Sequence, residues 1–295
     1  MNENRTENHT FDRTAFLVSE MRAREAECSP RLFDDPYARF FSTSEAVAIL
    51  ARIGGLVPTF VPSARARTRF FDDVLCRALD GGTAQVLNLG AGFDCRALRF
   101  PRAGVRYFEV DGAGLLAFKT ERLAAAGHPR GAVAVCADYH APDLVATLAA
   151  YGFDPALPTL ALWEGNSFYQ EAPAVPRLLG TLARAIPRLR IAFDYFEPIV
   201  IESGGRARGM TAALAALRAQ GAPFCTGIAD AGALAREVGL RVEEDTPMEA
   251  LLARLLPEMD LAAEPPPESH LCVLASDAAP ARRSRSSERA ARAAV

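Results

Sequence analysis

An apolar run over residues 86–89 breaks abruptly into the turn Gly90, Ala91, Gly92, and no other stretch constrains the fold of this chain as strongly. A later apolar run ends in Asp111. In a doubly wound α/β sheet, this combination forms the first strand, the turn beneath a nucleotide and an acidic residue placed for ribose hydroxyls. Glycine suits the turn because it has no Cβ to hold a ligand away from the backbone. The pattern predicts a nucleotide site, and a plain tight turn is the alternative.

As a dinucleotide fingerprint the same stretch is incomplete. Cys95 occupies the place where the G-x-G-x-x-G pattern needs its third glycine, which counts against a nicotinamide cofactor but leaves it as an alternative. Asp111 has a second interpretation as well, since an aspartate just ahead of a helix can cap it.

Strands and helices alternate along most of the chain after residue 83. Continuous apolar runs mark seven predicted strands, at 84–89, 105–110, 132–137, 159–163, 188–193, 240–243 and 271–275. Such runs are typical of a parallel sheet that is covered on both faces. Most of them end in an acidic residue or in the glycine turn, which gathers polar groups at the carboxyl edge, where α/β sheets bind ligands. The predicted fold class is therefore α/β and Rossmann-like.

Two regions fall outside this alternation. Helices predicted over 14–27, 45–53 and 63–79 precede the first strand, and residues 197–226 interrupt the later part with a glycine-rich loop and a helix. We interpret the first region as a helical cap and the second as a lid over the site. The predicted organisation is a cap over 1–82, an α/β domain over 83–276 with a lid at about 197–226, and a disordered tail over 277–295.

Charge and cysteine usage exclude several classes of function. The net charge is −3 over 295 residues, which predicts no nucleic-acid partner. The six cysteines form no C-x-x-C pair, as expected in a reducing cytosol, and His128 and His140 lack partners at metal-binding spacing, so no metal is predicted. The sequence shows no signal peptide and no run near the ~20 apolar residues of a membrane span. We expect a cytoplasmic protein with no membrane partner, of undetermined oligomeric state.

Several motifs occur in a fixed order between residues 14 and 276. They are RARE at 22–25, DPYA at 35–38, ARTRFFDD at 66–73, NLGAGFDCRALR at 88–99, FEVD at 108–111, EG at 164–165 followed by Tyr169, and FDY at 193–195. Together they resemble the leucine carboxyl methyltransferase family of S-adenosylmethionine (SAM) enzymes. The resemblance is greatest to its bacterial branch of polyketide O-methyltransferases, which includes tetracenomycin carboxyl methyltransferase.

This resemblance implies a fold, a cofactor and roles for particular residues. The fold would be the Rossmann-like sheet of class I SAM-dependent methyltransferases, with seven strands of which the last is antiparallel. Gly90 and Gly92 would let the turn approach the methionyl part of SAM, and Asp111 would accept hydrogen bonds from both ribose hydroxyls. Asp138 would bind the adenine amino group, with Tyr139 beside it.

The resemblance also selects residues for the charged end of the cofactor. Arg67 and Arg22 would hold the SAM carboxylate, because a guanidinium can bind a carboxylate bidentately. Glu164 would lie near the methionyl amine and sulfonium, and with Tyr169 it is the predicted catalytic pair. The alternative for both arginines is a solvated helix face, the usual place of this residue. The other cations of the region are expected to face solvent: Arg96, Arg99, Arg102, Arg106 and Lys119.

Methyl transfer from a sulfonium cancels charge as it proceeds, so the acceptor decides whether a base is needed. A carboxylate, with a reference pKa of about 4, is already ionised, whereas a phenol, near 10, benefits from a base. His140, Glu164 and Tyr169 are the candidate bases, and the sequence shows no evident Asp–His pair, which favours a carboxyl acceptor.

The predicted function is SAM-dependent O-methylation of a carboxylate or phenol on a small polyketide-like molecule. A protein C-terminal carboxyl methyltransferase, a nicotinamide-dependent oxidoreductase and a SAM-binding module without turnover are the alternatives.

Overall fold

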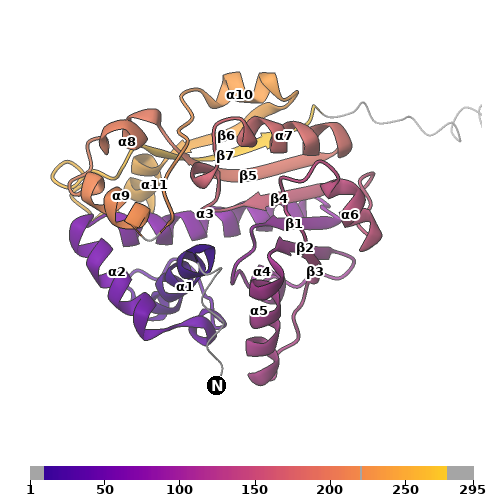
Figure 1. The fold of residues 1–295 in the computed structure, drawn as a ribbon, viewed down its shortest axis with the longest axis horizontal. Helices are drawn as coiled ribbons and strands as arrows, with labels where there is room; N and C mark the ends of the chain where they lie inside the picture. The colour runs from indigo at the N-terminus through magenta and orange to yellow at the C-terminus, as the bar shows by residue number, and fades with distance from the viewer. Residues whose placement is uncertain (1–9, 220, 278–295) are drawn as a thin grey trace, which may run out of the picture.

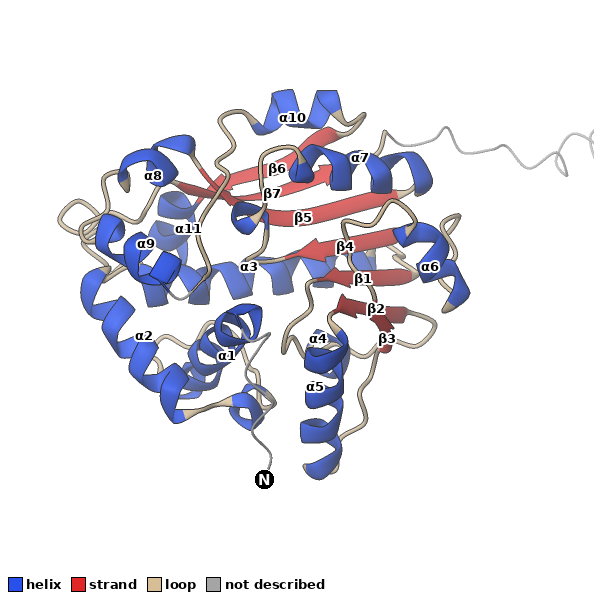
Figure 2. Ribbon diagram, in the orientation of Figure 1, coloured by secondary structure: helices blue, strands red, loops and turns tan. Residues whose placement is uncertain are grey.

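A computed structural model describes residues 10–219 and 221–277, with side chains from residue 14 onward. One seven-stranded sheet forms its centre (Figures 1 and 2). The strands are β1 (Gln85–Leu89), β2 (Arg106–Asp111), β3 (Val133–Cys136), β4 (Thr159–Trp163), β5 (Leu189–Phe196), β6 (Arg241–Pro247) and β7 (Ser269–Ala275). The tail predicted over 277–295 lies outside the described residues, apart from Asp277.

In space the strands follow the order β3-β2-β1-β4-β5-β7-β6. The first five pair in parallel, and β7 runs antiparallel to both β5 and β6. The predicted sheet with an antiparallel last strand is therefore confirmed. Strand order reverses at β1, with β2 and β3 on one side and β4 on the other. Ligands of α/β sheets bind at such a switch point.

Two strands extend further than the sequence predicts. β5 continues three residues past the predicted end at 193, because β7 pairs with it through Asp194↔Leu271, Tyr195↔His270 and Phe196↔Ser269. β6 likewise continues to Pro247 instead of ending at 243. Polar residues appeared to end both strands. Asp194 and Tyr195 of β5 are buried, whereas most residues of β6 are exposed, and in both strands polar residues continue the strand instead of ending it.

Helices cover both faces of the sheet. They are α1 (Thr10–Ala23), α2 (Ser44–Leu56), α3 (Phe60–Asp80), α4 (Arg96–Arg99), α5 (Ala113–Ala125), α6 (Leu144–Ala150), α7 (Ala174–Ala185), α8 (Pro198–Ser203), α9 (Met210–Ala219), α10 (Ala231–Glu237) and α11 (Met248–Leu255). α6, α7 and α10 pack on one face, and α3, α4 and α11 pack on the other (Figure 1).

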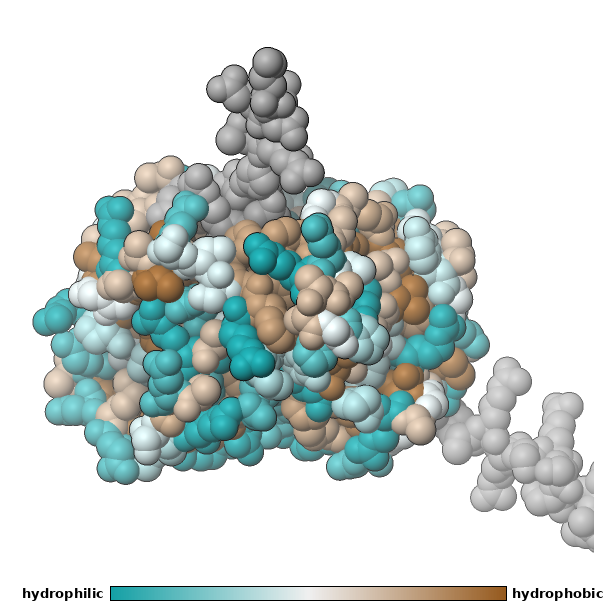
Figure 3. All heavy atoms as spheres, turned by 90° about the horizontal axis from the view of Figure 1, so that it is seen from below, coloured by the Kyte–Doolittle hydropathy of each residue, from teal (hydrophilic) through white to brown (hydrophobic). Residues whose placement is uncertain are grey.

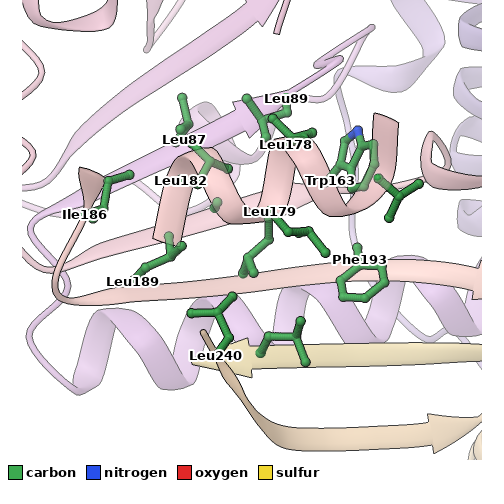
Figure 4. Close-up of a cluster of buried hydrophobic side chains, with 14 of the residues drawn as sticks. Leu87, Leu89, Trp163, Leu178, Leu179, Leu182, Ile186, Leu189, Phe193 and Leu240 are labelled. Carbon is green, nitrogen blue, oxygen red and sulfur yellow. The ribbon is translucent and has the colours of Figure 1, made fainter. Parts of the chain in front are cut away.

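The packing of α7 shows how the sequence specifies this arrangement. Apolar residues recur at helical spacing along it, and Leu178, Leu179 and Leu182 are almost fully buried. Figure 4 shows these side chains against Leu87 and Leu89 of β1 and neighbouring strands. The strands present apolar residues on this face and on the opposite one, so each needs a helical layer to exclude water.

α1 and α2 lie at the carboxyl edge of the sheet, toward which the arrows of β1 and β4 point (Figure 2). α1, α2 and α9 share one apolar cluster, to which they contribute Leu17, Met21, Leu50, Ile53, Met210, Ala213 and Leu217. At Gly209, just before α9, an added Cβ would lie 2.0 Å from the carbonyl oxygen of Leu56 at the end of α2. Only glycine permits so close a contact, so α9 is joined tightly to the N-terminal helices.

The surface mixes hydrophilic and apolar residues on the face seen in Figure 3, from below the view of Figure 1. Within the described ranges, no single helix is long and apolar enough to cross a membrane. α2 and α3 meet that criterion only as a pair, and the pair is bent by 109°.

Candidate functional site

A cavity of about 1250 Å³ opens at the carboxyl edge of the sheet. Residues at the ends of β1, β2, β3, β4 and β5 line it from below, and α1, α3 and α9 contribute side chains from the other side. Every site residue that the sequence predicts lies on its wall: Arg22, Arg67, Gly90, Gly92, Asp111, Asp138, Tyr139, Glu164 and Tyr169. The topology thus brings together residues that are widely separated in the sequence.

The glycine turn has a physical requirement for glycine. Gly90 has a φ of 60°, and a Cβ there would come within 2.8 Å of the Asn166 amide group. Gly92 has a φ of 50°, which other L residues rarely adopt. Asn166 Nδ2 donates to the carbonyl oxygen of Gly90 at 3.4 Å and to that of Glu164 at 2.7 Å, which ties the turn after β4 to the glycine turn.

Asp111, at the end of β2, supports the same turn. One of its carboxylate oxygens accepts from the Gly92 N–H at 2.8 Å, and the other accepts from the Gly112 N–H at 2.7 Å. An ionised carboxylate offers about four lone-pair directions, so it can accept several hydrogen bonds at once. Asp111 therefore both shapes the turn and faces the cavity.

Asp138 and Tyr139 follow β3 at the opposite end of the cavity from the lid. Asp138 accepts from the His140 N–H at 2.8 Å, and the Tyr139 hydroxyl lies 3.2 Å from Gln170 Nε2. Burial raises the pKa of Tyr139 to about 12, so this phenol stays protonated and available as a donor. The pair forms a polar end to the cavity, as does Asp111.

Glu164, directly after β4, binds three arginines. Its Oε1 lies 3.0 Å from Arg22 Nη2 and 3.2 Å from Arg67 Nε, and its Oε2 lies 2.7 Å from Arg96 Nη1. Burial alone would raise the pKa of this carboxyl. The three guanidinium groups, Arg96 first, outweigh it and hold the pKa well below its usual range. Glu164 is thus a permanently ionised anchor between α1, α3 and the sheet.

The solvent-facing prediction for Arg96, Arg99 and Lys119 is wrong. Arg96 is 2% exposed and pairs with Asp72 at 2.7 Å and with Asp94. The side chain of Arg99 is also buried and binds Asp72, while Lys119 is 1% exposed and lies 2.9 Å from Glu109. Helical periodicity suggested solvated faces, but a charged residue can be buried where carboxylates from other elements meet it, and those contacts are nonlocal.

Around Glu164 the charges balance. Four guanidinium groups (Arg22, Arg67, Arg96, Arg99) meet four carboxylates (Asp72, Asp94, Glu164, Asp194). These eight residues, here called the ion cluster, connect α1, α3, the glycine turn, β4 and β5. The Nε of Arg22 is buried and has no hydrogen-bond partner among the described residues.

The far side of the ion cluster leads to Tyr169. Arg67 reaches Asp194 at 3.2 Å, and Asp194 also accepts from the Gly165 N–H at 2.6 Å. Tyr169 is partly buried near both charges, and this burial raises the pKa of its phenol. Beyond Tyr169 the cavity wall becomes largely apolar, with Leu17, Phe60, Phe168, Met210, Leu217 and Phe224.

The candidate bases are poor proton acceptors. Glu164 is held ionised by the arginines, and Tyr169 keeps its proton because burial raises its pKa. Burial lowers the pKa of His140, which weakens it as a base, and it stands beside Asp138 after β3. The proton-accepting role considered for these three residues is therefore unsupported by their surroundings.

Sequence reasoning missed other residues of the wall. Asn166 belongs to none of the motifs singled out from the sequence, although its side chain packs on Gly90. The cavity also contains His270 of β7, whose ring binds Asp245 of β6 at 3.2 Å. The sequence shows no evident Asp–His pair, because these two residues are 25 positions apart and meet only through the antiparallel register of β6 and β7.

The sequence is similar to those of proteins named as SAM-dependent methyltransferases. The chain is 38% identical over 209 residues to a Parafrankia sp. (strain EAN1pec) protein named provisionally as a SAM-dependent methyltransferase, covering 67% of each chain. A similarly named protein of Mycobacterium sp. (strain KMS) is 34% identical over 209 residues, covering 62% of this chain and 68% of that one.

Solved structures show the same fold. One provisionally named methyltransferase from Thermobifida fusca YX superposes with a TM-score of 0.60 at 16% identity, covering 90% of this chain and 94% of its own. A DUF574 family protein from Streptomyces avermitilis MA-4680 gives a TM-score of 0.58 at 13% identity, covering 90% and 97%.

Fold and site together define a SAM-dependent methyltransferase, and SAM is its cofactor. Residues 15–183 match the model of the leucine carboxyl methyltransferase family, and the chain belongs to that family. This assignment removes the nicotinamide-dependent alternative. Within the described part of the chain, no group of three or more His, Cys, Asp or Glu side chains is arranged to hold a metal ion.

Asp111→Ala should weaken S-adenosylhomocysteine (SAH) binding by about ten- to a hundredfold, since a hydrogen bond to a charged group contributes ~1.5–3 kcal/mol. Competition against labelled SAH, with adenosine and 2′,3′-dideoxyadenosine as competitors, separates the two functions of this carboxylate. The parent should prefer adenosine, and Asp111→Ala should bind both alike. If the variant still prefers adenosine, Asp111 supports only the turn and does not read the ribose.

Proposed function

We propose that this methyltransferase transfers the methyl group of SAM to the carboxylate of a small, largely aromatic acid of the polyketide type. One observation carries the proposal: a single cavity joins the glycine turn and ion cluster to an apolar chamber, and the three candidate bases on its wall, Glu164, Tyr169 and His140, are poor proton acceptors. An acceptor that is already ionised fits such a cavity, whereas a phenol would need a base.

The described residues fit the cofactor along its whole length. Asp138 and Tyr139 suit the adenine, Asp111 suits the ribose, and the glycine turn leaves room for the methionyl chain. Arg22 and Arg67 supply positive charge for the cofactor carboxylate. The Nε of Arg22, which has no hydrogen-bond partner among the described residues, can donate to that carboxylate. The ion cluster is neutral by itself, so a zwitterionic ligand segment adds no uncompensated charge.

The volume of the cavity supports a second ligand. Single small-molecule sites typically enclose ~300–1,000 Å³, and this cavity is about 1250 Å³. When bound, SAM supplies an electrophilic methyl group on a sulfonium. The protein contributes alignment of the two reactants and exclusion of water, effects that can lower a barrier by up to ~7–11 kcal/mol. Tyr169, kept protonated, is placed to donate a hydrogen bond at the junction rather than to remove a proton.

The region predicted as a lid, residues 197–226, provides the apolar chamber in this proposal. It contains α8, which the sequence did not predict, and α9, whose buried side chains Met210, Ala213 and Leu217 line the cavity. The N–H of Cys225 donates to the carbonyl oxygen of Phe168 at 2.7 Å, which closes the chamber against the turn after β4.

The function itself can be tested with two cofactors and two acceptors. SAH should raise the melting temperature of the protein and NAD should not, because only a ligand that binds the native state stabilises it.

With tritiated SAM, 2-naphthoate should be methylated and 2-naphthol should not. The rate with 2-naphthoate should stay level between about pH 6 and 8, since a carboxylate with a reference pKa near 4 is ionised throughout. Preference for 2-naphthol, with a rate rising with pH, would replace the carboxyl acceptor by a phenol.

Arg67→Ala should weaken SAH binding by about ten- to a hundredfold, and Arg67→Lys should fall in between because lysine keeps the charge but loses the planar fork. 5′-Methylthioadenosine, which lacks the carboxylate, is the control ligand and should bind parent and variants alike. An equal loss of methylthioadenosine affinity would show that Arg67 holds Glu164 and Asp194 in place without reading the cofactor.

Ala213→Trp should abolish methylation of 2-naphthoate while leaving SAH affinity within twofold, because the indole would fill the chamber under α9. Ala215→Trp is the matched control, since Ala215 lies on the same helix but is exposed. Overpacking costs about 1–3 kcal/mol, so the melting temperature of both variants is measured first. Full turnover by a folded Ala213→Trp protein would contradict the placement of the acceptor under α9.

A further inference from the structure

His270 is a polar, ring-bearing residue on the wall of the apolar chamber. It pairs with Tyr195 across β5 and β7, and the two rings stack with centroids 4.9 Å apart and an interplanar angle of 8°. The side chain is 18% exposed. The stacking fixes the plane of the imidazole, so its two nitrogens have defined directions.

Carboxylates occupy both of those nitrogens. Nδ1 lies 3.2 Å from Asp245 Oδ1 of β6, and Nε2 lies 3.2 Å from Glu197 Oε1, just after β5. The hydrogen bond to Asp245, followed by the charges of Asp245 and Glu197, raises the pKa of His270 despite its burial. With Tyr195 on the third side, the groups facing the ring therefore favour the imidazolium, which donates from both nitrogens.

The two carboxylates differ in how firmly they are held. Asp245 also accepts from the Tyr195 hydroxyl, at 3.0 and 3.2 Å, and its side chain is 28% exposed. The side chain of Glu197 is 43% exposed and does not line the cavity. Glu197 can therefore turn into water at little cost, whereas Asp245 keeps its place on Nδ1.

The position of His270 determines what part of a ligand it can touch. β7 is the second strand beyond β4, so His270 stands about 10 Å across the sheet from the strand end that carries Glu164, at ~4.8 Å per strand. At this separation His270 does not reach the Glu164 carboxylate. The wall of the same cavity also carries Phe168, Phe196, Phe224 and Met248.

We propose that His270 selects acceptors that carry a second anionic oxygen at the end remote from the methylated carboxylate. The ring would donate from Nε2 to a carboxylate or phenolate oxygen of the acceptor, which takes the place of Glu197 while Asp245 continues to hold Nδ1. One anionic partner replaces another, so the imidazolium stays compensated. The proposal rests on the proposed function and assigns its acceptor class: elongated aromatic acids with two acidic groups at opposite ends.

The test compares 2,6-naphthalenedicarboxylate with 2-naphthoate on the SAH-loaded, full-length protein, by calorimetric titration. The two probes share the ring system and differ only in the remote carboxylate. The parent should bind the dicarboxylate about ten- to a hundredfold more tightly. His270→Phe keeps a ring on Tyr195 but donates no hydrogen bond, and should reduce this ratio to near one. Glu197→Ala should increase the ratio, because nothing then needs to be displaced.

Several results would overturn the assignment. A ratio that survives in His270→Phe, or that falls in Glu197→Ala, would show that His270 and Glu197 serve the fold and not the ligand. His270→Gln, which retains a donor near the Nε2 position, should recover part of the ratio and guards against a folding defect in the phenylalanine variant. Failure of the parent to bind SAH would refute the methyltransferase assignment, whereas SAH binding with equal affinity for both probes would refute only the role of His270.

Discussion

The site depends on the buried contact between Glu164 and three arginines. One carboxylate at the end of β4 receives Arg22 from α1, Arg67 from α3 and Arg96 from the segment after the glycine turn. Removing one partner of a buried ion pair leaves an uncompensated charge and typically costs 3–5 kcal/mol. The N-terminal helices, the glycine turn and the sheet are therefore held in one relative arrangement by charges that also line the cavity. In the function proposed above, the same side chains support the structure and bind the ligand.

Much of this fold could be predicted from local patterns. Apolar runs identified the seven strands, because a sheet covered on both faces requires them, and glycine after β1 identified the turn because Gly90 and Gly92 adopt positive φ. The extensions of β5 and β6 could not be predicted, since they depend on pairing with β7 across a large sequence distance. Polar residues in those extensions resembled strand ends.

Charged residues were the least predictable part of the site. Arg96 and Lys119 have the sequence environment of solvated residues. They can be buried because carboxylates outside their own helices compensate their charges: Asp72 and Asp94 for Arg96, and Glu109 for Lys119. His270 and Asp245 likewise meet through strand register. A sequence shows which side chains can ionise, but the compensation of each charge is decided by tertiary contacts that no local window contains.

The close contact of Gly209 with Leu56 has a kinetic consequence. Because α9 covers the apolar chamber and is seated directly on α2, and α2 shares its apolar cluster with α1, a motion that lifts α9 carries the N-terminal helices with it. α1 bears Arg22. We therefore expect opening to be a single event that uncovers both halves of the cavity, so that a methylated product and a spent cofactor leave through the same transition. Such an enzyme would exchange both ligands once per cycle instead of retaining one while it releases the other.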